Sequence, residues 1–489
     1  MKINPIRTVK LNLSAARNFL GALCASLVLL VVTRSHAADG SWAADAAGNW
    51  NTATSWFGNV IADGANSTAS FTNDVTAIRT VTLDGAHTLG NLTFGDGDST
   101  TTGGWFVSGA NILTLSATAQ PVITVNAMNG INGTDPTNDV TITSILAGSQ
   151  GFVKRGVGTL TVEAVNTLTG PVQIDEGVIK FGNATAFGPI ATSKIIFNGG
   201  ALRVGTNAFA VPTIAPTMGY SNLVQTTGTI ICSNGNYDVY AGSFYGAGTL
   251  NIRTTGRLST SGVNGQFTNF TGTLDMTGSS SGGILRIGTP GLDLSRLTLN
   301  LGSTSGRAQP TFTANTSQNV LLGALSGGVG SQLLGTDKNT TVATLMIGFL
   351  NTSTVFDGRM RDGSTASARI TAFTKVGTGT LTLSGVNDYT SLTVISNGIV
   401  ALTNSGALSV TPSITLNAGT TLDVSGRTNT TVGWSLAAAQ TLAGSGTINA
   451  TAVAPGNAAL TAGTVAPGSG TGNIGKLIFN GGLTLDGLA

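Results

Sequence analysis

Charged residues are scarce in this chain. Aspartate, glutamate, lysine and arginine make up 9% of its 489 residues, against about a quarter in ordinary soluble domains. The formal net charge is only +2, whereas a nucleic-acid-binding protein needs a basic face to neutralise phosphates. The low charge argues against such a face, and we expect no nucleic-acid partner.

Cysteine, histidine and proline are also rare. Cys24 and Cys232 are the only cysteines, which excludes a cysteine metal cluster and, once the N-terminal segment is removed, an internal disulfide. His87 is the only histidine beyond residue 37. Because no nucleophile elbow is coupled to an oxyanion loop, we interpret His87 as a turn residue and not as part of a Ser-His-Asp triad. With 12 prolines in all, Pro-rich disorder is a poor interpretation.

Long apolar runs are missing except near the N-terminus. Four basic residues precede the run Phe19–Val32, and Ser35 and Ala37 place small residues where a signal peptidase needs them. We expect residues 1–37 to be a signal peptide that is cleaved after Ala37. An uncleaved membrane anchor is the alternative, but the run is short for a hydrocarbon core of about 30 Å.

Removal of this segment changes the charge of the protein. The segment carries five basic residues and no acidic one, so the formal charge falls from +2 to −3. A signal peptide also implies export, and we expect the secretion machinery as a partner. Exported proteins can use disulfides, but a long repeat protein buries enough area to do without them.

The sequence contains one segment that occurs twice. From Phe152 it reads FVKRGVGTLTVEAVNTLTGPVQIDEGVIKF, and from Phe373 it reads FTKVGTGTLTLSGVNDYTSLTVISNGIVAL. The two copies align without a gap at an offset of 221 residues, with identities at Lys375, Gly377, Gly379, Thr380, Leu381, Asn387, Thr390 and Gly398. Such self-similarity is the signature of a repeat architecture.

Each copy has a finer period of about 20 residues. Glycine leads a short alternating apolar stretch at Gly158, Gly177 and Gly200, and the second copy does the same at Gly379, Gly398 and Gly419. Period-two alternation of Thr, Val, Ile and Leu, bounded by Gly, Asn and Ser, predicts half-buried strands. One such strand cannot bury its inner side, whereas stacked coils form a continuous core, which favours a solenoid.

The motif K-x-G-x-G-T-L-T-L-S-G-x-N-x-Y-T, which begins at Lys375, resembles the autotransporter-associated β-strand repeat of bacterial surface passenger proteins. Ser391 and Leu392 stand where that family usually has two glycines, and the earlier copy departs further, with Leu168 in place of the tyrosine. The resemblance implies a scaffold and brings no catalytic residue with it.

We therefore predict an all-β protein, a right-handed single-stranded parallel β-helix with a distinct N-terminal cap region. Residues 38–104 are expected to form a Trp-rich cap with the first coils, and residues 105–489 the β-helix, with repeats at 152–204 and 373–424. The last residues, GGLTLDGLA, resemble part of another coil, so we expect the C-terminus to be truncated or the anchor to lie in another protein. An exposed final coil would allow self-association through unpaired strand edges.

Trp42, Trp50 and Trp56 are the weak candidates for ligand binding. Three tryptophans within fifteen residues could form a platform on which sugar rings stack. The other interpretation is a cap, because the terminal repeat of a solenoid must close an open core. We favour the cap.

Paired carboxylates are the weak candidates for metal binding or catalysis. Asp96 and Asp98 lie in GDGD, and Asp135 and Asp139 flank a polar loop. Asp96 and Asp98 could share a cation, but a single GDGD is not the repeated motif of calcium-binding rolls. Glycan cleavage needs convergent acids, and the remaining acids are scattered. We expect no catalytic residue and no cofactor.

Three functions remain open from the sequence. The leading hypothesis is an exported cell-surface or extracellular passenger, adhesin-like or a surface-display scaffold without catalytic activity, whose partners are extracellular glycans or other cells. The alternative is a polysaccharide-binding or polysaccharide-cleaving β-helix. The third is an inert spacer in a larger autotransporter-type protein.

Overall fold

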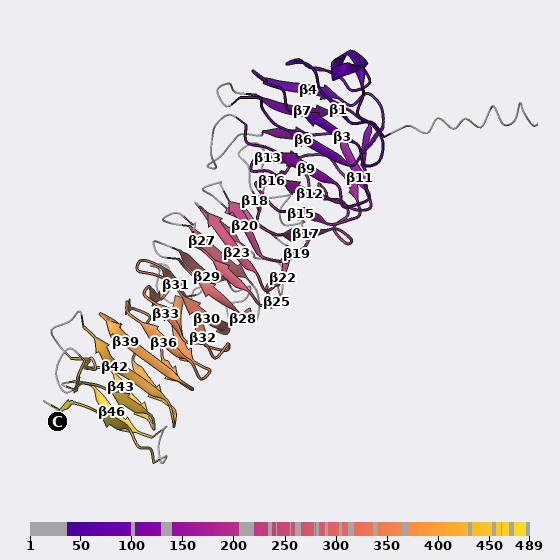
Figure 1. The fold of residues 1–489 in the computed structure, drawn as a ribbon. Helices are drawn as coiled ribbons and strands as arrows, with labels where there is room; N and C mark the ends of the chain where they lie inside the picture. Colours follow the sequence, from indigo (N-terminus) through magenta and orange to yellow (C-terminus); the bar gives the residue numbers. More distant parts are fainter. Residues whose placement is uncertain are drawn as a thin grey trace, which may run out of the picture.

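The computed structural model is an elongated parallel β-solenoid (Figure 1). The predicted signal peptide up to residue 36, and Asp135, lie outside the residues that the structure describes. These described residues are 37–98, 103–128, 139–204, 220–232, 237–240, 242–254, 256–259, 266–277, 279, 283–288, 292–302, 306–311, 317–335, 341–363, 369–428, 433–451, 456–460, 462–468 and 474–485.

The solenoid has three faces, each a ladder of parallel strands. The first face contains β1 (Gly40–Ser41), β3 (Thr68–Phe71), β6 (Asn91–Phe94), β9 (Val122–Val125), β12 (Phe152–Arg155), β15 (Val172–Ile174), β17 (Lys194–Phe197), β19 (Ser221–Val224), β22 (Ser243–Gly246), β25 (Asn269–Phe270), β32 (Thr341–Ile347), β35 (Arg369–Lys375), β38 (Thr393–Ile395), β41 (Ser413–Leu416), β43 (Thr441–Gly444) and β46 (Thr464–Pro467).

The second face follows the first in each coil. It contains β2 (Gly48–Asn49), β4 (Ile78–Thr82), β7 (Gly104–Ser108), β10 (Val140–Ile142), β13 (Thr159–Val162), β16 (Val178–Phe181), β18 (Ala201–Val204), β20 (Thr227–Cys232), β23 (Thr249–Thr254), β26 (Thr273–Asp275), β33 (Thr354–Phe356), β36 (Thr380–Leu383), β39 (Ile399–Asn404), β42 (Thr421–Arg427), β44 (Thr447–Asn449) and β47 (Ile478–Asn480).

The third face is interrupted where coils lack a strand on it. It contains β5 (His87–Leu89), β8 (Ile112–Leu115), β11 (Ile145–Gly148), β14 (Thr167–Leu168), β21 (Tyr237–Val239), β24 (Arg257–Ser259), β27 (Ile284–Gly288), β29 (Arg307–Thr311), β31 (Gln332–Leu334), β34 (Arg359–Arg361), β37 (Val386–Asn387), β40 (Ala407–Leu408), β45 (Ala458–Leu460) and β48 (Leu483–Leu485).

Two long strands connect the N-terminal and C-terminal halves of the stack. β28 (Leu292–Asn300) and β30 (Gln318–Ser326) pair with each other on two faces, and the register shifts between Leu294 and Thr298. The second half of β28 pairs with β26, whereas the first half of β30 pairs with β32. Because of this shift, β28 and β30 each pass from the first face to the second, and the stack is continuous through both strands.

The predicted glycine-led strands are confirmed as successive rungs. β13, β16 and β18 begin just after Gly158, Gly177 and Gly200, and they pair in parallel. Leu160, Ile179 and Leu202 stand opposite one another in that register and are fully buried. Each coil thus buries the inner side chains of its neighbour, which supplies the stability that a single coil lacks.

Helical structure is minimal. In the described ranges it consists of two 3-10 turns, η1 (Ala53–Ser55) and η2 (Phe57–Asn59). Within those ranges, no helix has the length and apolar character that crossing a bilayer requires.

Candidate functional site

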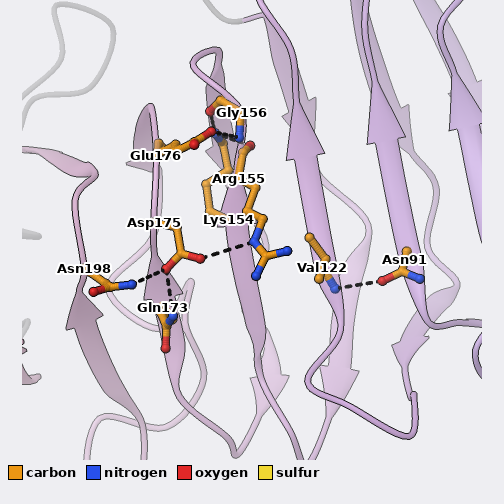
Figure 2. A network of polar contacts seen from close by, with 9 residues as sticks. All are labelled: Asn91, Val122, Lys154, Arg155, Gly156, Gln173, Asp175, Glu176 and Asn198. Atoms are coloured by element: carbon orange, nitrogen blue, oxygen red, sulfur yellow. Dashed lines mark hydrogen bonds and ion pairs between the residues drawn. The ribbon is translucent and has the colours of Figure 1, made fainter.

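The lysine of the repeat motif is buried and binds backbone carbonyl groups. Lys154 is fully buried at the end of β12. Its Nζ donates hydrogen bonds to the carbonyl oxygens of Arg155 at 2.9 Å, Gly156 at 2.6 Å and Glu176 at 3.2 Å. Figure 2 shows the lysine between its own turn and the turn of the next coil. The ammonium group therefore links two neighbouring coils.

Lys375 makes the same contacts in the second copy of the repeat. Its Nζ donates to the carbonyl oxygens of Val376 at 2.6 Å, Gly377 at 2.8 Å and Asn397 at 3.4 Å. Burial lowers the pKa of Lys375 to about 8. The repeated lysine is a structural link between coils and is not exposed to a ligand.

Lys154 makes the stability of the fold depend on pH. Burial lowers its pKa to about 7, although the charges of Glu176 and Asp139 oppose this shift. An unfolded lysine titrates near 10.4, so between these values the unfolded chain binds a proton that the folded chain does not. Stability therefore rises with pH across that window. From pH 7 to about pH 9, we expect the free energy of unfolding to increase by ~2 kcal/mol more in the wild type than in Lys154→Met.

Denaturant unfolding at several pH values measures this difference. Lys194→Met is the matched control, because Lys194 is exposed at the start of β17, and its pH profile should follow the wild type. If the free energy of unfolding changes with pH equally in Lys154→Met and in the wild type, the pH dependence does not come from Lys154.

The asparagine of the motif joins coils on the third face. Asn387 is buried; its Oδ1 accepts a hydrogen bond from the Met360 amide at 2.8 Å, and its Nδ2 donates to the carbonyls of Gly385 at 3.1 Å and Ala407 at 3.2 Å. In the first copy, Asn166 accepts from the Leu146 amide at 2.7 Å and donates to the Ala186 carbonyl at 2.7 Å. One side chain thus contacts the coil before it and the coil after it.

A ladder of polar side chains covers part of the first face. Arg155 Nε lies 3.2 Å from Asp175 Oδ2, and Asp175 Oδ1 accepts hydrogen bonds from Gln173 at 2.7 Å and Asn198 at 3.1 Å (Figure 2). Thr226 extends the ladder by donating to Asn198 Oδ1 at 3.1 Å. We call these five residues the polar ladder.

The polar ladder is accessible and partly pre-organised. The Arg155 side chain is 56% exposed. Burial opposes ionisation of Asp175, but the hydrogen bonds from Gln173, Asn198 and Arg155 outweigh it and lower the pKa of this carboxyl. A fixed carboxylate beside amide and guanidinium groups can exchange hydrogen bonds with sugar hydroxyls.

The weak metal candidates Asp96 and Asp98 lie close together, and a third acid joins them. One carboxylate oxygen each from Asp74, Asp96 and Asp98 lies within 4.8 Å of the other two. Asp96 Oδ1 accepts from the Val75 amide at 3.0 Å. Local desolvation, followed by the charges of Asp98 and Asp96, raises the pKa of Asp74. Three oxygens are fewer than the six to eight that calcium binds, so the three acids stay a weak candidate for a cation site.

Chelation tests this prediction. If the three carboxylates share calcium, millimolar calcium will raise the thermal midpoint by a few degrees over the value in EDTA, because a ligand of the folded state stabilises it. Asp96→Asn will abolish the shift. Asp84→Asn is the control, because Asp84 is an exposed acid outside this group. A midpoint that is the same in calcium and EDTA would contradict the prediction.

The three tryptophans are enclosed in the core of the first coils. Trp42, Trp50 and Trp56 are at most 2% exposed, and all three contact Phe71 with ring centroids between 5.5 and 5.9 Å apart. Trp56 Nε1 donates to the Trp50 carbonyl and Trp50 Nε1 to the Ala62 carbonyl. In this structure, the indoles present no open face on which a sugar could stack.

His87 has a structural role. The prediction that His87 is a turn residue is wrong. His87 begins strand β5, because this segment pairs with β8 on the third face. Its side chain is 7% exposed and packs beside Trp50. Its Nδ1 lies 3.4 Å from Asp63.

Asp139 is buried and accepts a hydrogen bond from the Thr159 amide at 2.6 Å. Burial raises the pKa of Asp139, and its role is to cap the start of β13.

Comparison with known proteins now identifies the scaffold. Residues 152–180 and 373–402 match the family model described as passenger-associated-transport-repeat. The chain carries two copies of this repeat. They are the two copies predicted from the sequence, and the buried lysine and asparagine residues described above occupy matching positions in the two copies. No solved structure matches the chain.

A curated relative extends the similarity beyond the two repeats. The Adhesin BmaC autotransporter of Brucella suis biovar 1 (strain 1330) is 27% identical over 494 residues, which cover 95% of this chain. The chain spans 12% of the length of that relative. The chain is therefore an autotransporter-passenger-like β-helix, and its distant homology is to an adhesin.

Proposed function

We propose that this passenger-like β-helix is an adhesin-like protein of the cell surface that binds extracellular glycans or neighbouring cells without catalysing a reaction. The observation that carries the proposal is similarity to an autotransporter adhesin along nearly the whole chain. The elongated stack supports it (Figure 1), because a rod of coils holds its outer faces away from the surface to which it is attached.

The polar ladder supports binding through the outer faces. Its charged and amide groups are held by hydrogen bonds within one coil and between neighbouring coils, so little side-chain entropy is lost when they bind a sugar. The buried lysine and asparagine of the repeat motif, in contrast, form hydrogen bonds with backbone groups inside the stack. We infer that function resides in outward-facing residues that lie outside the repeat's recurring positions.

Binding assays test the proposal. The chain without residues 1–37, immobilised on beads, should retain cells and a subset of glycans from a panel, and the heat-unfolded chain should not. Asp175→Asn together with Asn198→Ala should weaken the glycan signal. A folded chain that retains neither glycans nor cells would favour the spacer hypothesis.

The same preparation tests the absence of catalysis. Prolonged incubation with acidic and neutral polysaccharides should release neither reducing ends nor unsaturated products. Sustained product formation that is lost with Asp96→Asn would instead support the polysaccharide-cleaving alternative.

A further inference from the structure

The turn after β38 contains an asparagine followed by a glycine. Asn397 is exposed, and the Gly398 amide donates a hydrogen bond to Asn397 Oδ1 at 2.8 Å. Because Oδ1 is bonded to Cγ, this contact also brings the Gly398 nitrogen close to Cγ of the same side chain. Attack of that nitrogen on Cγ is the first step of deamidation, and glycine hinders it least because it has no Cβ.

The side-chain amide of Asn397 is also less restrained than those of the other described asparagines that precede a glycine, Asn198 and Asn480. In the described part of the chain, the Asn397 side chain makes one hydrogen bond, which its Oδ1 accepts. Asn198 Nδ2 donates to Asp175 at 3.1 Å, and Asn480 Nδ2 donates to Asn449 at 3.1 Å. Both of these amides are held by the neighbouring coil, whereas that of Asn397 can turn toward its glycine.

The first copy of the repeat has an acid where the second copy has Asn397. Glu176 lies at the matching position, 221 residues earlier. The charges of Glu176 and Asp139 both oppose the effect of burial on the pKa of Lys154. The lysine of the first copy is therefore buried with two acids near it.

The second copy lacks both acids. Ser353 Oγ replaces the Asp139 carboxylate, since it accepts a hydrogen bond from the Thr380 amide at 3.1 Å, as Asp139 does from the Thr159 amide. Burial lowers the pKa of Lys375, and no acid among the described residues opposes it. A buried ammonium group without a nearby opposite charge destabilises the folded chain. A carboxylate at position 397 would supply that charge.

We propose that Asn397 deamidates spontaneously and thereby gives the buried Lys375 a counter-charge. The Gly398 nitrogen bonds to Asn397 Cγ, the Cγ–Nδ2 bond breaks, and the proton of the Gly398 nitrogen leaves with Nδ2 as ammonia. Water then opens the five-membered imide at one of its two carbonyl carbons and leaves aspartate or isoaspartate. No oxidation or reduction takes place, and water is the co-reactant.

The aspartate product would lie beside the lysine. Lys375 Nζ donates to the Asn397 carbonyl oxygen at 3.4 Å, so the new carboxylate belongs to a residue that the ammonium group already contacts. Isoaspartate would instead add a carbon to the backbone of the turn and disturb this contact. We therefore expect only the aspartate product to strengthen the link between the coils.

Peptide mapping by mass spectrometry tests the reaction. The folded chain without residues 1–37 is incubated at mildly alkaline pH, and the conversion of Asn397, Asn198 and Asn480 to acids is followed over time. Asn397 should convert roughly tenfold faster than the other two, because its side chain already contacts the attacking nitrogen. The rate should rise with pH, since that nitrogen must lose its proton.

Incubation in concentrated urea separates the effect of the fold from that of the Asn-Gly sequence. The three asparagines should then convert at similar rates, because unfolding removes the contacts that distinguish them. If Asn397 remains an amide in the folded protein, or converts no faster there than Asn480, the proposal is overturned.

Stability measurements test the counter-charge. Asn397→Asp represents the product, and Asn397→Gln is the matched control that keeps an amide. At pH 7, Asn397→Asp should unfold at a higher denaturant concentration than Asn397→Gln. Its midpoint should also rise less between about pH 8 and pH 10, because the carboxylate raises the pKa of Lys375 toward its ordinary value.

A Lys375→Met background shows whether the lysine is responsible. In that background, the difference between Asn397→Asp and Asn397→Gln should disappear, because the charge that the carboxylate pairs with is gone. An equal difference with and without Lys375, or a lower midpoint for Asn397→Asp at pH 7, would overturn the counter-charge.

Discussion

Gly398→Ala will lower the free energy of unfolding by about 3 kcal/mol, because a methyl group has no room there. Gly398 has a φ of +71°, which disfavours any other residue. Its Cβ would lie 2.5 Å from the Gly377 carbonyl oxygen, 2.6 Å from that of Gly379 and 2.9 Å from Lys375 Nζ. The substitution strains the turn and pushes against the lysine that joins the coils. Denaturant unfolding measures the loss.

Gly419→Ala is the matched control for this substitution. Gly419 leads the strand of the next coil and has a φ of +79°, but a Cβ at this position meets no atom within 4 Å. Only the backbone penalty remains, so we expect a loss of ~1 kcal/mol. A similar loss for both variants would show that the contact with Lys375 and its turn is unimportant.

Asn387→Asp will destabilise the protein by about 3 kcal/mol at neutral pH, because the side chain loses both donors and gains a buried charge. The carbonyls of Gly385 and Ala407 would then face a carboxylate oxygen instead of the amide nitrogen that now donates to them. Protonation of the carboxyl restores one donor, so the loss should shrink as the pH falls toward 4. Thermal unfolding across this range measures both effects.

Asn319→Asp controls for the added charge. Asn319 is exposed on β30, and the same change there should alter stability by less than about 0.5 kcal/mol. If Asn387→Asp is equally mild, the hydrogen bonds that Asn387 makes to the neighbouring coils contribute nothing measurable to the stack.

Local pattern was enough to predict the strands and the repeat. Alternating Thr, Leu and Val after Gly158 and Gly379 predicts a strand with one buried side, and β13 and β36 lie there. β36 has one buried side as predicted, whereas in β13 the threonines are buried as well. The match of both copies to the passenger repeat confirms that interpretation. The sequence also marks Lys375 and Asn387 as recurring. It does not say that they are buried, because polar residues at fixed spacing fit an outer surface equally well.

The candidate sites depended on contacts between coils. Asp96 and Asp98 are visible in one motif, but Asp74 joins them only because the turn after β3 stacks on the turn after β6. The sequence left open whether the tryptophans face solvent or the core. Contacts with Phe71 from the next coil decide that they are buried.

The sequence by itself determined that this protein is a stack of parallel coils, because each short strand has one apolar side that only a neighbouring strand can cover. It also placed the two passenger repeats. Only the tertiary structure decided which outer residues meet. Arg286, Arg307 and Arg359 are 21 and 52 residues apart, since coils differ in loop length, yet the strand register places them on one face.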